Sequence, residues 1–182
     1  MVETLYGEVA DDVFNKASSI KLLVCDVDGV FSDGRIYLGN DGEELKAFHT
    51  KDGFGIKALI ASGVEVAIIT GRNSRIVHDR MSALNIKHII QGKEDKLPTM
   101  KDIMSSLSLT AEQVAYIGDD MADMPCIELA SLGVAVNDAH PYVIKHANYC
   151  TFTKGGFGAV RELCDLIMLS QNTLQDAKGA SV

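Results

Sequence analysis

Carboxylates stand in two short clusters of the sequence, and each cluster follows an apolar run. Asp26 and Asp28 come after the run 20–24, and Asp119 comes after the run 113–118. Carboxylates that converge on one point repel each other, so they favour a site that also holds a cation. Mg²⁺ takes oxygen ligands and keeps room for waters and a substrate phosphate. We therefore expect Asp26 and Asp119 to bind Mg²⁺ through their side chains, with the backbone carbonyl of Asp28 as a third ligand.

The same residue types can carry out phosphoryl transfer. A carboxylate that binds a metal with one oxygen can attack phosphorus with the other, and the product is an aspartyl-phosphate. Asp26 is the candidate nucleophile, and Asp28 is the candidate general acid for the leaving alcohol and later the general base for water. Thr70 can donate a hydrogen bond to a phosphoryl oxygen, and Lys96 can neutralise charge on the transferred group.

Each of these residues also has an ordinary structural explanation. Asp28 can simply orient the turn that follows it, because Asp is common in turns. A lone lysine such as Lys96 usually lies on the solvated surface of a helix. Thr70 and Gly71 can end a strand ahead of a helix that Asn73 caps. Taken as a set in this order, the residues favour the catalytic explanation.

The pattern of apolar and polar runs predicts the elements that position these side chains. Strands separated by helices are typical of βαβ units and a parallel sheet. Such a sheet places its ligands beyond the carboxyl ends of its strands, and the candidate residues follow four of the expected strands. The expected strands are 20–24, 64–70, 88–91, 113–118, 133–136 and 149–152. The expected helices are 9–17, 52–62, 73–85, 95–107, 124–130, 140–147 and 158–170.

One segment interrupts this alternation. Residues 34–49 hold two short runs around the sequence Gly-Asn-Asp-Gly at 39–42, which is typical of a β-hairpin turn. We therefore expect one three-layer α/β/α, Rossmann-like domain over residues 1–182, with a β-hairpin insertion at about 34–49. The polar tail, at about 171–182, is expected to be frayed.

Composition excludes several classes of function. The formal net charge is -8 and there is no basic run, so neither nucleic acid nor an anionic membrane surface is an expected partner. No apolar run is long enough to span a membrane. No C-x-x-C pair occurs among the four cysteines, so we expect buried, reduced thiols. The acidic N-terminus lacks the apolar core of a signal peptide, which favours a cytoplasmic location.

Four motifs now stand in order along the chain. DVDGV begins at Asp26, ITGR ends at Arg72, Lys96 follows, and GDDMAD ends at Asp123. Together they resemble the four motifs of the haloacid dehalogenase superfamily of phosphatases, and the resemblance covers about residues 21–169. It implies a Mg²⁺-dependent phosphatase that forms phospho-Asp26.

Shorter segments resemble a narrower family, the capless 3-deoxy-D-manno-octulosonate 8-phosphate phosphatases. These segments are DGRIY, FHTKDG, TGR, residues 91–96 and GGFGAVRE. The resemblance implies a sugar acid phosphate substrate, a role in lipopolysaccharide precursor synthesis and no cap domain. It also implies a homotetramer with the hairpins at its centre, and a mobile segment at 154–158 that reaches over a neighbouring active site.

Several assignments stay open at this point. Arg72, with Gly71, is expected to face the substrate or its phosphate. Arg35, His49 and Lys51 are candidates for contacts with the sugar acid, although a solvated surface explains Arg35 and Lys51 equally well.

The last motif and the substrate are also open. Adjacent Asp119 and Asp120 compete for the metal. We favour Asp119 and place Asp123 outside the metal ligands, bracing Lys96, while Asp120 and Asp123 can also favour a helix N-terminus through its dipole. The substrate could instead be another sugar acid phosphate, such as an acylneuraminate 9-phosphate. A non-catalytic binding subunit of the same fold is the alternative from another class.

Overall fold

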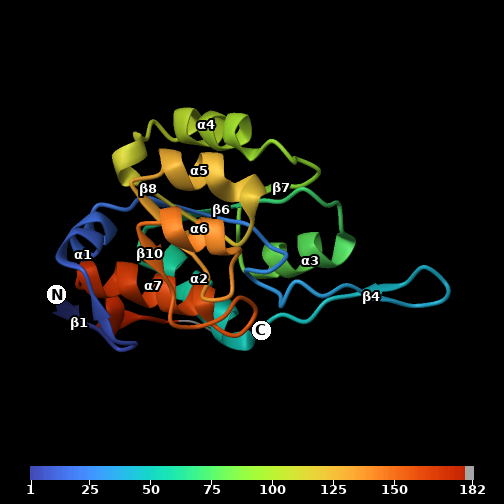
Figure 1. Ribbon diagram of the computed structural model, residues 1–182, viewed down its shortest axis with the longest axis horizontal. Helices are drawn as coiled ribbons and strands as arrows, with labels where there is room; N and C mark the ends of the chain where they lie inside the picture. Colours follow the sequence, from blue (N-terminus) through green and yellow to red (C-terminus); the bar gives the residue numbers. More distant parts are fainter. Residues whose placement is uncertain (179–182) are drawn as a thin grey trace.

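The computed structural model describes residues 1–178, and a six-stranded parallel sheet forms its centre (Figure 1). The strand order is β10-β9-β8-β3-β6-β7. The chain builds the sheet outward from β3 to β7 on one side, and then returns to build β8 to β10 on the other. The order therefore reverses between β3 and β8, where open α/β sheets bind their ligands. The strands are β3 (Leu22–Cys25), β6 (Glu65–Ile69), β7 (His88–Ile90), β8 (Val114–Gly118), β9 (Leu132–Ala135) and β10 (Tyr149–Cys150).

Helices cover both faces of this sheet. Figure 1 shows α4 and α5 over one face and α1, α2 and α7 over the other, while α3 packs against β7 and α6 against β9. This arrangement confirms the predicted three-layer α/β/α fold. The helices are α1 (Asp11–Ser18), α2 (Thr50–Ala61), α3 (Arg75–Ala83), α4 (Lys96–Ser106), α5 (Met124–Leu129), α6 (Pro141–His146) and α7 (Ala159–Ser170).

The central strands are buried on both faces, which explains why they read as continuous apolar runs in the sequence. Every residue of β3 and β9 is buried, and so is every residue of β8. The core therefore lies on both sides of the sheet.

The predicted hairpin is present and extends away from the domain (Figure 1). Strand β4 (Tyr37–Leu38) pairs antiparallel with β5 (Glu44–Leu45). Gly42, in the turn between them, has a positive φ of 81°, a conformation that glycine adopts without strain. Apolar side chains at its surface are exposed, with Leu38 at 72% and Leu45 at 55%. The hairpin thus has no apolar core of its own.

Three details of the first part of the fold differ from the sequence prediction. Two-residue strands β1 (Val2–Glu3) and β2 (Glu8–Val9) form an antiparallel ribbon that was not predicted. The first helix consequently begins at Asp11 rather than at residue 9. The N-cap of α3 is Ser74 and not Asn73, because extended backbone continues one residue further.

The tail was expected to be frayed from residue 171. As far as residue 178 it contains a short 3₁₀ helix, Leu174–Asp176, and the side chain of Gln171 donates hydrogen bonds to the carbonyls of Ala17 and Ile20. Residues 179–182 lie outside the described part of the chain.

Other expectations concern cysteines and membranes. All four cysteines are free; Cys25, Cys126 and Cys164 are buried and Cys150 is partly exposed. Over residues 1–178, none of the helices has the length and apolar character needed to span a bilayer.

Candidate active site

A cavity of about 450 Å³ opens at the carboxyl ends of β3, β6 and β8, close to the reversal in strand order. It gathers seven of the residues predicted from the sequence: Asp26, Asp28, Thr70, Gly71, Arg72, Lys96 and Asp119. Gly34, Glu94, Asp120 and Ala122 complete the lining. The edge of the sheet that the motifs indicated is therefore the edge where the cavity lies.

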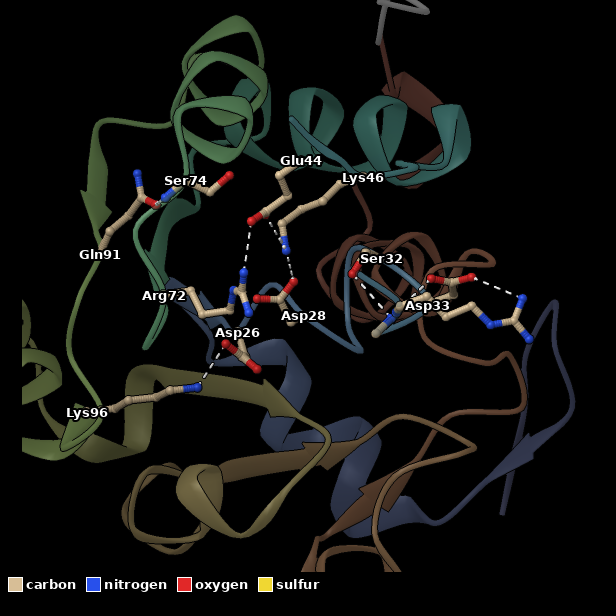
Figure 2. A network of polar contacts seen from close by, with 12 residues as sticks. Asp26, Asp28, Ser32, Asp33, Glu44, Lys46, Arg72, Ser74, Gln91 and Lys96 are labelled. Carbon is tan, nitrogen blue, oxygen red and sulfur yellow. Dashed lines mark hydrogen bonds and ion pairs between the residues drawn. The ribbon is translucent and has the colours of Figure 1, made fainter. Parts of the chain in front are cut away.

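Lys96 is buried at the floor of this cavity, between two carboxylates. It is the first residue of α4 and is 4% exposed. Its Nζ lies 2.8 Å from Oδ1 of Asp26 and donates a hydrogen bond of 2.7 Å to Oδ1 of Asp123 (Figure 2 shows the pair with Asp26). Although burial opposes it, the charges of the two carboxylates raise the pKa of Lys96. The lysine therefore carries a fixed positive charge beside Asp26.

Asp123 has every oxygen occupied by donors from the protein. Its Oδ1 accepts from Lys96 and from the hydroxyl of Tyr116 at 2.6 Å. Its Oδ2 accepts from the backbone N–H groups of Asp119 at 2.9 Å and Asp120 at 3.1 Å. This arrangement matches the prediction that Asp123 braces Lys96. It also lets Asp123 fix the loop that carries Asp119.

Asp26, Asp119 and Asp123 bring carboxylate oxygens within 4.8 Å of one another. Burial and repulsion between these groups raise the pKa values of Asp26 and Asp119 well above the usual range for Asp. Asp123 already accepts four hydrogen bonds, so Asp26 and Asp119 are the carboxylates left to bind a cation. A divalent ion with oxygen ligands fits this donor set, because it offsets the repulsion that burial creates.

Asp120 makes a different contact from its neighbour. Its side chain accepts a hydrogen bond of 2.7 Å from the backbone N–H of Met121, as the N-cap of the short helix that follows. Asp120 is exposed, whereas Asp119 lies against Gly29, where an added Cβ would overlap the Asp119 carboxylate. Asp119 thus faces the Asp26 loop, and Asp120 caps the helix.

The rim of the cavity is an ion-pair network that sequence reasoning missed. Nζ of Lys46 pairs with Oδ1 of Asp28 and lies 3.5 Å from Oε1 of Glu44. Oε2 of Glu44 accepts a hydrogen bond of 2.8 Å from Nη2 of Arg72 (Figure 2). Although burial opposes it, the charges of Lys46 and Arg72 lower the pKa of Glu44.

A signal for this network does exist in the sequence. Glu44 and Lys46 are two residues apart on a strand and its extension, so their side chains point to the same face, while Leu45 points to the other. Nothing in the sequence indicates that this face turns toward Asp28.

Three predicted substrate contacts do not line the cavity. The side chain of Arg35 is 75% exposed and lies 3.7 Å from Asp33. Nδ1 of His49 accepts a hydrogen bond of 3.1 Å from the backbone N–H of Lys51, so His49 is the N-cap of α2. Lys51 is itself exposed. In the single chain these three residues lie outside the cavity, and their assignment to the substrate stays a prediction.

The glycine-rich segment packs against the loop that carries Asp26. The N–H of Gly156 donates a hydrogen bond of 2.8 Å to the carbonyl of Val30, and the N–H of Gly155 donates one of 2.9 Å to Asp138. A Cβ at Gly155 would overlap the carbonyl oxygen of Gly29, so only glycine allows this approach. Residues 155–156 are therefore held by hydrogen bonds within their own chain. The resemblance implied a mobile segment at 154–158, and a mobile segment would be free of such contacts.

Comparison with known proteins identifies relatives of this chain. A model of the haloacid dehalogenase-like hydrolase family matches residues 87–162. The 3-deoxy-D-manno-octulosonate 8-phosphate phosphatase KdsC of Yersinia pestis is 54% identical over 181 residues, which cover 100% of this chain and 97% of the relative. The enzyme of the same name from Escherichia coli K12 is 52% identical, with 98% of this chain and 95% of the relative covered.

Solved structures give the same result. The crystal structure of the Yersinia pestis phosphatase has a TM-score of 0.97 and 54% identity, and covers 100% of this chain and 98% of its own. A Moraxella catarrhalis 3-deoxy-D-manno-octulosonate 8-phosphate phosphatase, solved with magnesium, phosphate and KDO, has a TM-score of 0.90 and 41% identity over 92% of this chain and 97% of its own. The chain therefore belongs to the family of 3-deoxy-D-manno-octulosonate 8-phosphate phosphatases, within the haloacid dehalogenase-like hydrolases.

Proposed function

We propose that this chain is a Mg²⁺-dependent phosphatase that hydrolyses 3-deoxy-D-manno-octulosonate 8-phosphate to the free sugar acid and phosphate. The observation that carries the proposal is the cavity in which Asp26, Asp28, Lys96 and Asp119 meet at the strand reversal. The relatives named above support the substrate. The bound magnesium and KDO of the Moraxella catarrhalis enzyme support the cofactor and the product.

The first half of the reaction forms a phospho-enzyme. The free carboxylate oxygen of Asp26 attacks phosphorus, the bond from phosphorus to the sugar oxygen breaks, and Asp28 gives its proton to that oxygen. Lys96, 2.8 Å from Asp26, stabilises the negative charge that gathers on the transferred group.

The second half regenerates the enzyme. Asp28, now ionised, takes a proton from water, and the water oxygen attacks the phosphorus of phospho-Asp26. The bond from phosphorus to Asp26 breaks, phosphate leaves, and Asp28 is again protonated. Thr70, which is 2% exposed, and Gly71 both line the cavity, which supports the proposal that they donate hydrogen bonds to the phosphoryl oxygens.

The metal is proposed to lie between the carboxylates of Asp26 and Asp119, with the backbone carbonyl of Asp28 as a further ligand. Bound there, Mg²⁺ supplies positive charge that offsets the phosphate and the two carboxylates. Arg72 is proposed to contact the substrate, because it follows Thr70 and Gly71 into the same cavity.

The test measures phosphate release from 3-deoxy-D-manno-octulosonate 8-phosphate, with Mg²⁺ and with EDTA, for the wild type and for Asp26→Asn. We expect rapid release that needs both the metal and Asp26. The same assay with an acylneuraminate 9-phosphate compares the alternative substrate. Release from that ester alone would overturn the named substrate and keep the chemistry, whereas no release from any phosphate ester would overturn the enzyme.

We further propose that the chain acts in the cytoplasm, in the synthesis of lipopolysaccharide precursors, and that it is a homotetramer. The exposed apolar side chains of the hairpin support an assembly, since an isolated hairpin with such a surface invites a partner. These are Ile36, Tyr37, Leu38 and Leu45. Light scattering at micromolar concentration tests this point, and the mass of a monomer would overturn it.

A further inference from the structure

One side chain of the hairpin reaches the proposed general acid. Lys46 follows β5 and pairs through Nζ with Oδ1 of Asp28 (Figure 2). Apart from this pair, the carboxylate of Asp28 has no hydrogen bond or ion pair with a described residue. We propose that Lys46 is a positioning residue that holds the Asp28 carboxylate in place for proton transfer. The inference rests on the proposed role of Asp28.

Asp28 needs such a partner because its backbone gives little support. It follows the end of β3, and the next residue, Gly29, has a positive φ of 88°. The side chain therefore projects from a turn and not from a hydrogen-bonded strand. In both halves of the reaction it must face the oxygen on the far side of phosphorus from Asp26, and a misplacement of about 1 Å can cost about 100-fold in rate.

The pairing leaves one oxygen of Asp28 available. Lys46 binds Oδ1, so Oδ2 is the atom left to give a proton to the leaving alcohol and to take one from water. A carboxylate that is anchored through one oxygen can exchange protons through the other without rotating. The geometry thus assigns the two oxygens of Asp28 to two separate tasks.

Lys46 is itself held more firmly than a surface lysine. Its side chain is 0% exposed, while those of Asp28 and Glu44 are each 23% exposed. A covered ammonium needs partners, because an unpaired charge away from water is costly. Glu44 supplies the second partner at 3.5 Å and is fixed in turn by Arg72. The network therefore connects the hairpin to the strand end that carries Arg72.

The experiment combines Lys46→Met with Asp28→Asn in a double-mutant cycle and measures kcat and KM for phosphate release. If Lys46 acts through Asp28, Lys46→Met lowers kcat by roughly 10- to 100-fold and leaves KM within about 2-fold. In the Asp28→Asn background the same change has no further effect, because the group it positions is gone. An aryl phosphate, whose leaving group needs no proton, keeps the rates of the Asp28→Asn variants measurable.

Other outcomes would overturn the inference. A raised KM, with effects that multiply in the double variant, would mean that Lys46 contacts the substrate directly. An unchanged kcat would mean that it has no role. Lys101→Met, at an exposed lysine of α4, is the matched control and should leave both constants unchanged.

Two further measurements separate this inference from a folding defect and from the proposed function. The unfolding temperature and solution mass of Lys46→Met should match the wild type, and Lys46→Gln provides the same test if the Met variant aggregates. Phosphate release by the wild type that depends on Asp26 establishes the function independently. Once Asp26-dependent phosphate release is established, the double-mutant cycle of Lys46 and Asp28 tests the role of Lys46 on its own.

Discussion

Two networks of alternating charge meet in the cavity, and they differ in how they are built. The floor network joins Asp26, Lys96 and Asp123, and Lys96 and Asp123 are 4% and 1% exposed. The rim network joins Asp28, Lys46, Glu44 and Arg72, and the side chain of Arg72 is 45% exposed. The floor comes from the ends of the sheet strands and from the helix that follows β7. The rim depends on an inserted hairpin.

This difference means that the floor residues affect both the stability of the fold and the catalytic activity, whereas the rim residues mainly affect the activity. A buried charge that loses its partner destabilises the whole domain, because water cannot replace that partner. A partly exposed pair contributes only about 0–1 kcal/mol to stability. Removing the buried lysine of the floor should therefore lower both activity and stability, whereas changes at the rim should lower activity at nearly constant stability.

The largest expected effect is on the nucleophile at the floor. Asp26→Asn removes the attacking oxygen, so we expect kcat to fall by about 10⁴-fold or more. Stopped assays of phosphate release measure the loss. Asp102→Asn, at an exposed position of α4, is the control and should retain full activity. If Asp26→Asn kept more than a tenth of the wild-type rate, the nucleophile would be another residue.

Next comes a direct comparison of the two networks. Lys96→Met leaves Asp26 and Asp123 buried without their cation, so we expect a loss of about 3–5 kcal/mol in the free energy of unfolding. Activity should fall by about 100-fold or more. Arg72→Met should cost less than about 1 kcal/mol in stability, because water can solvate Glu44. Urea denaturation of both variants gives the two values, and equal losses would break the comparison.

A third prediction concerns the metal at the floor. Asp119→Asn removes a carboxylate whose pKa is raised by burial and by repulsion from Asp26, so the metal-free variant should unfold at a higher temperature than the metal-free wild type. Mg²⁺ should raise the unfolding temperature of the wild type, because it binds the folded state only. Thermal scans with Mg²⁺ and with EDTA check both points. An equal response of the two proteins to Mg²⁺ would contradict the role of Asp119.

The smallest effect on activity is expected at Asp52, a buried carboxylate outside both networks. Its Oδ1 accepts a hydrogen bond of 2.8 Å from the backbone N–H of Arg161, its Oδ2 has no hydrogen bond, and burial raises its pKa from 3.8 to about 7. The folded state therefore holds this proton more tightly than the unfolded state. The resulting stability is present below about pH 4 and is lost as the pH rises through about 7.

Asp52→Asn cannot ionise and keeps an acceptor for Arg161. We expect the variant to gain stability relative to the wild type between pH 4 and 8, by at most about 4 kcal/mol. Urea denaturation across this range measures the difference. If the difference did not change with pH, the carboxyl of Asp52 would titrate alike in the folded and unfolded states.

The sequence predicted the floor residues, but at the rim it predicted only Asp28 and Arg72 and missed Glu44 and Lys46, for a physical reason. Asp26 and Asp119 directly follow apolar runs that are typical of buried strands, and Lys96 lies at the start of an expected helix after another such run. Local patterns therefore predict that the three residues lie at the same edge of the sheet. Lys46 and Glu44 are charged residues on a hairpin, and such residues are usually solvated. Their contact with Asp28 depends on the orientation of the hairpin relative to the sheet, and no local sequence pattern predicts that orientation.

The smaller errors have similar causes. The ribbon of β1 and β2 consists of strands too short to show a period in the sequence. The cap of α3 was predicted at Asn73, but Ser74 takes that place. Cap geometry is decided by one or two backbone angles, and residue types alone do not determine them.

The hydrogen bond from Gly156 to Val30 has a consequence for the way the enzyme is made. The loop with the nucleophile leaves the ribosome early, while its glycine partner is translated much later along the chain. We expect a nascent or truncated chain that stops short of Gly155 to carry every catalytic side chain and yet lack the support of its nucleophile loop. Catalytic competence should therefore arrive only after Gly155 and Gly156 have been made, which keeps shorter nascent chains from consuming phosphate esters.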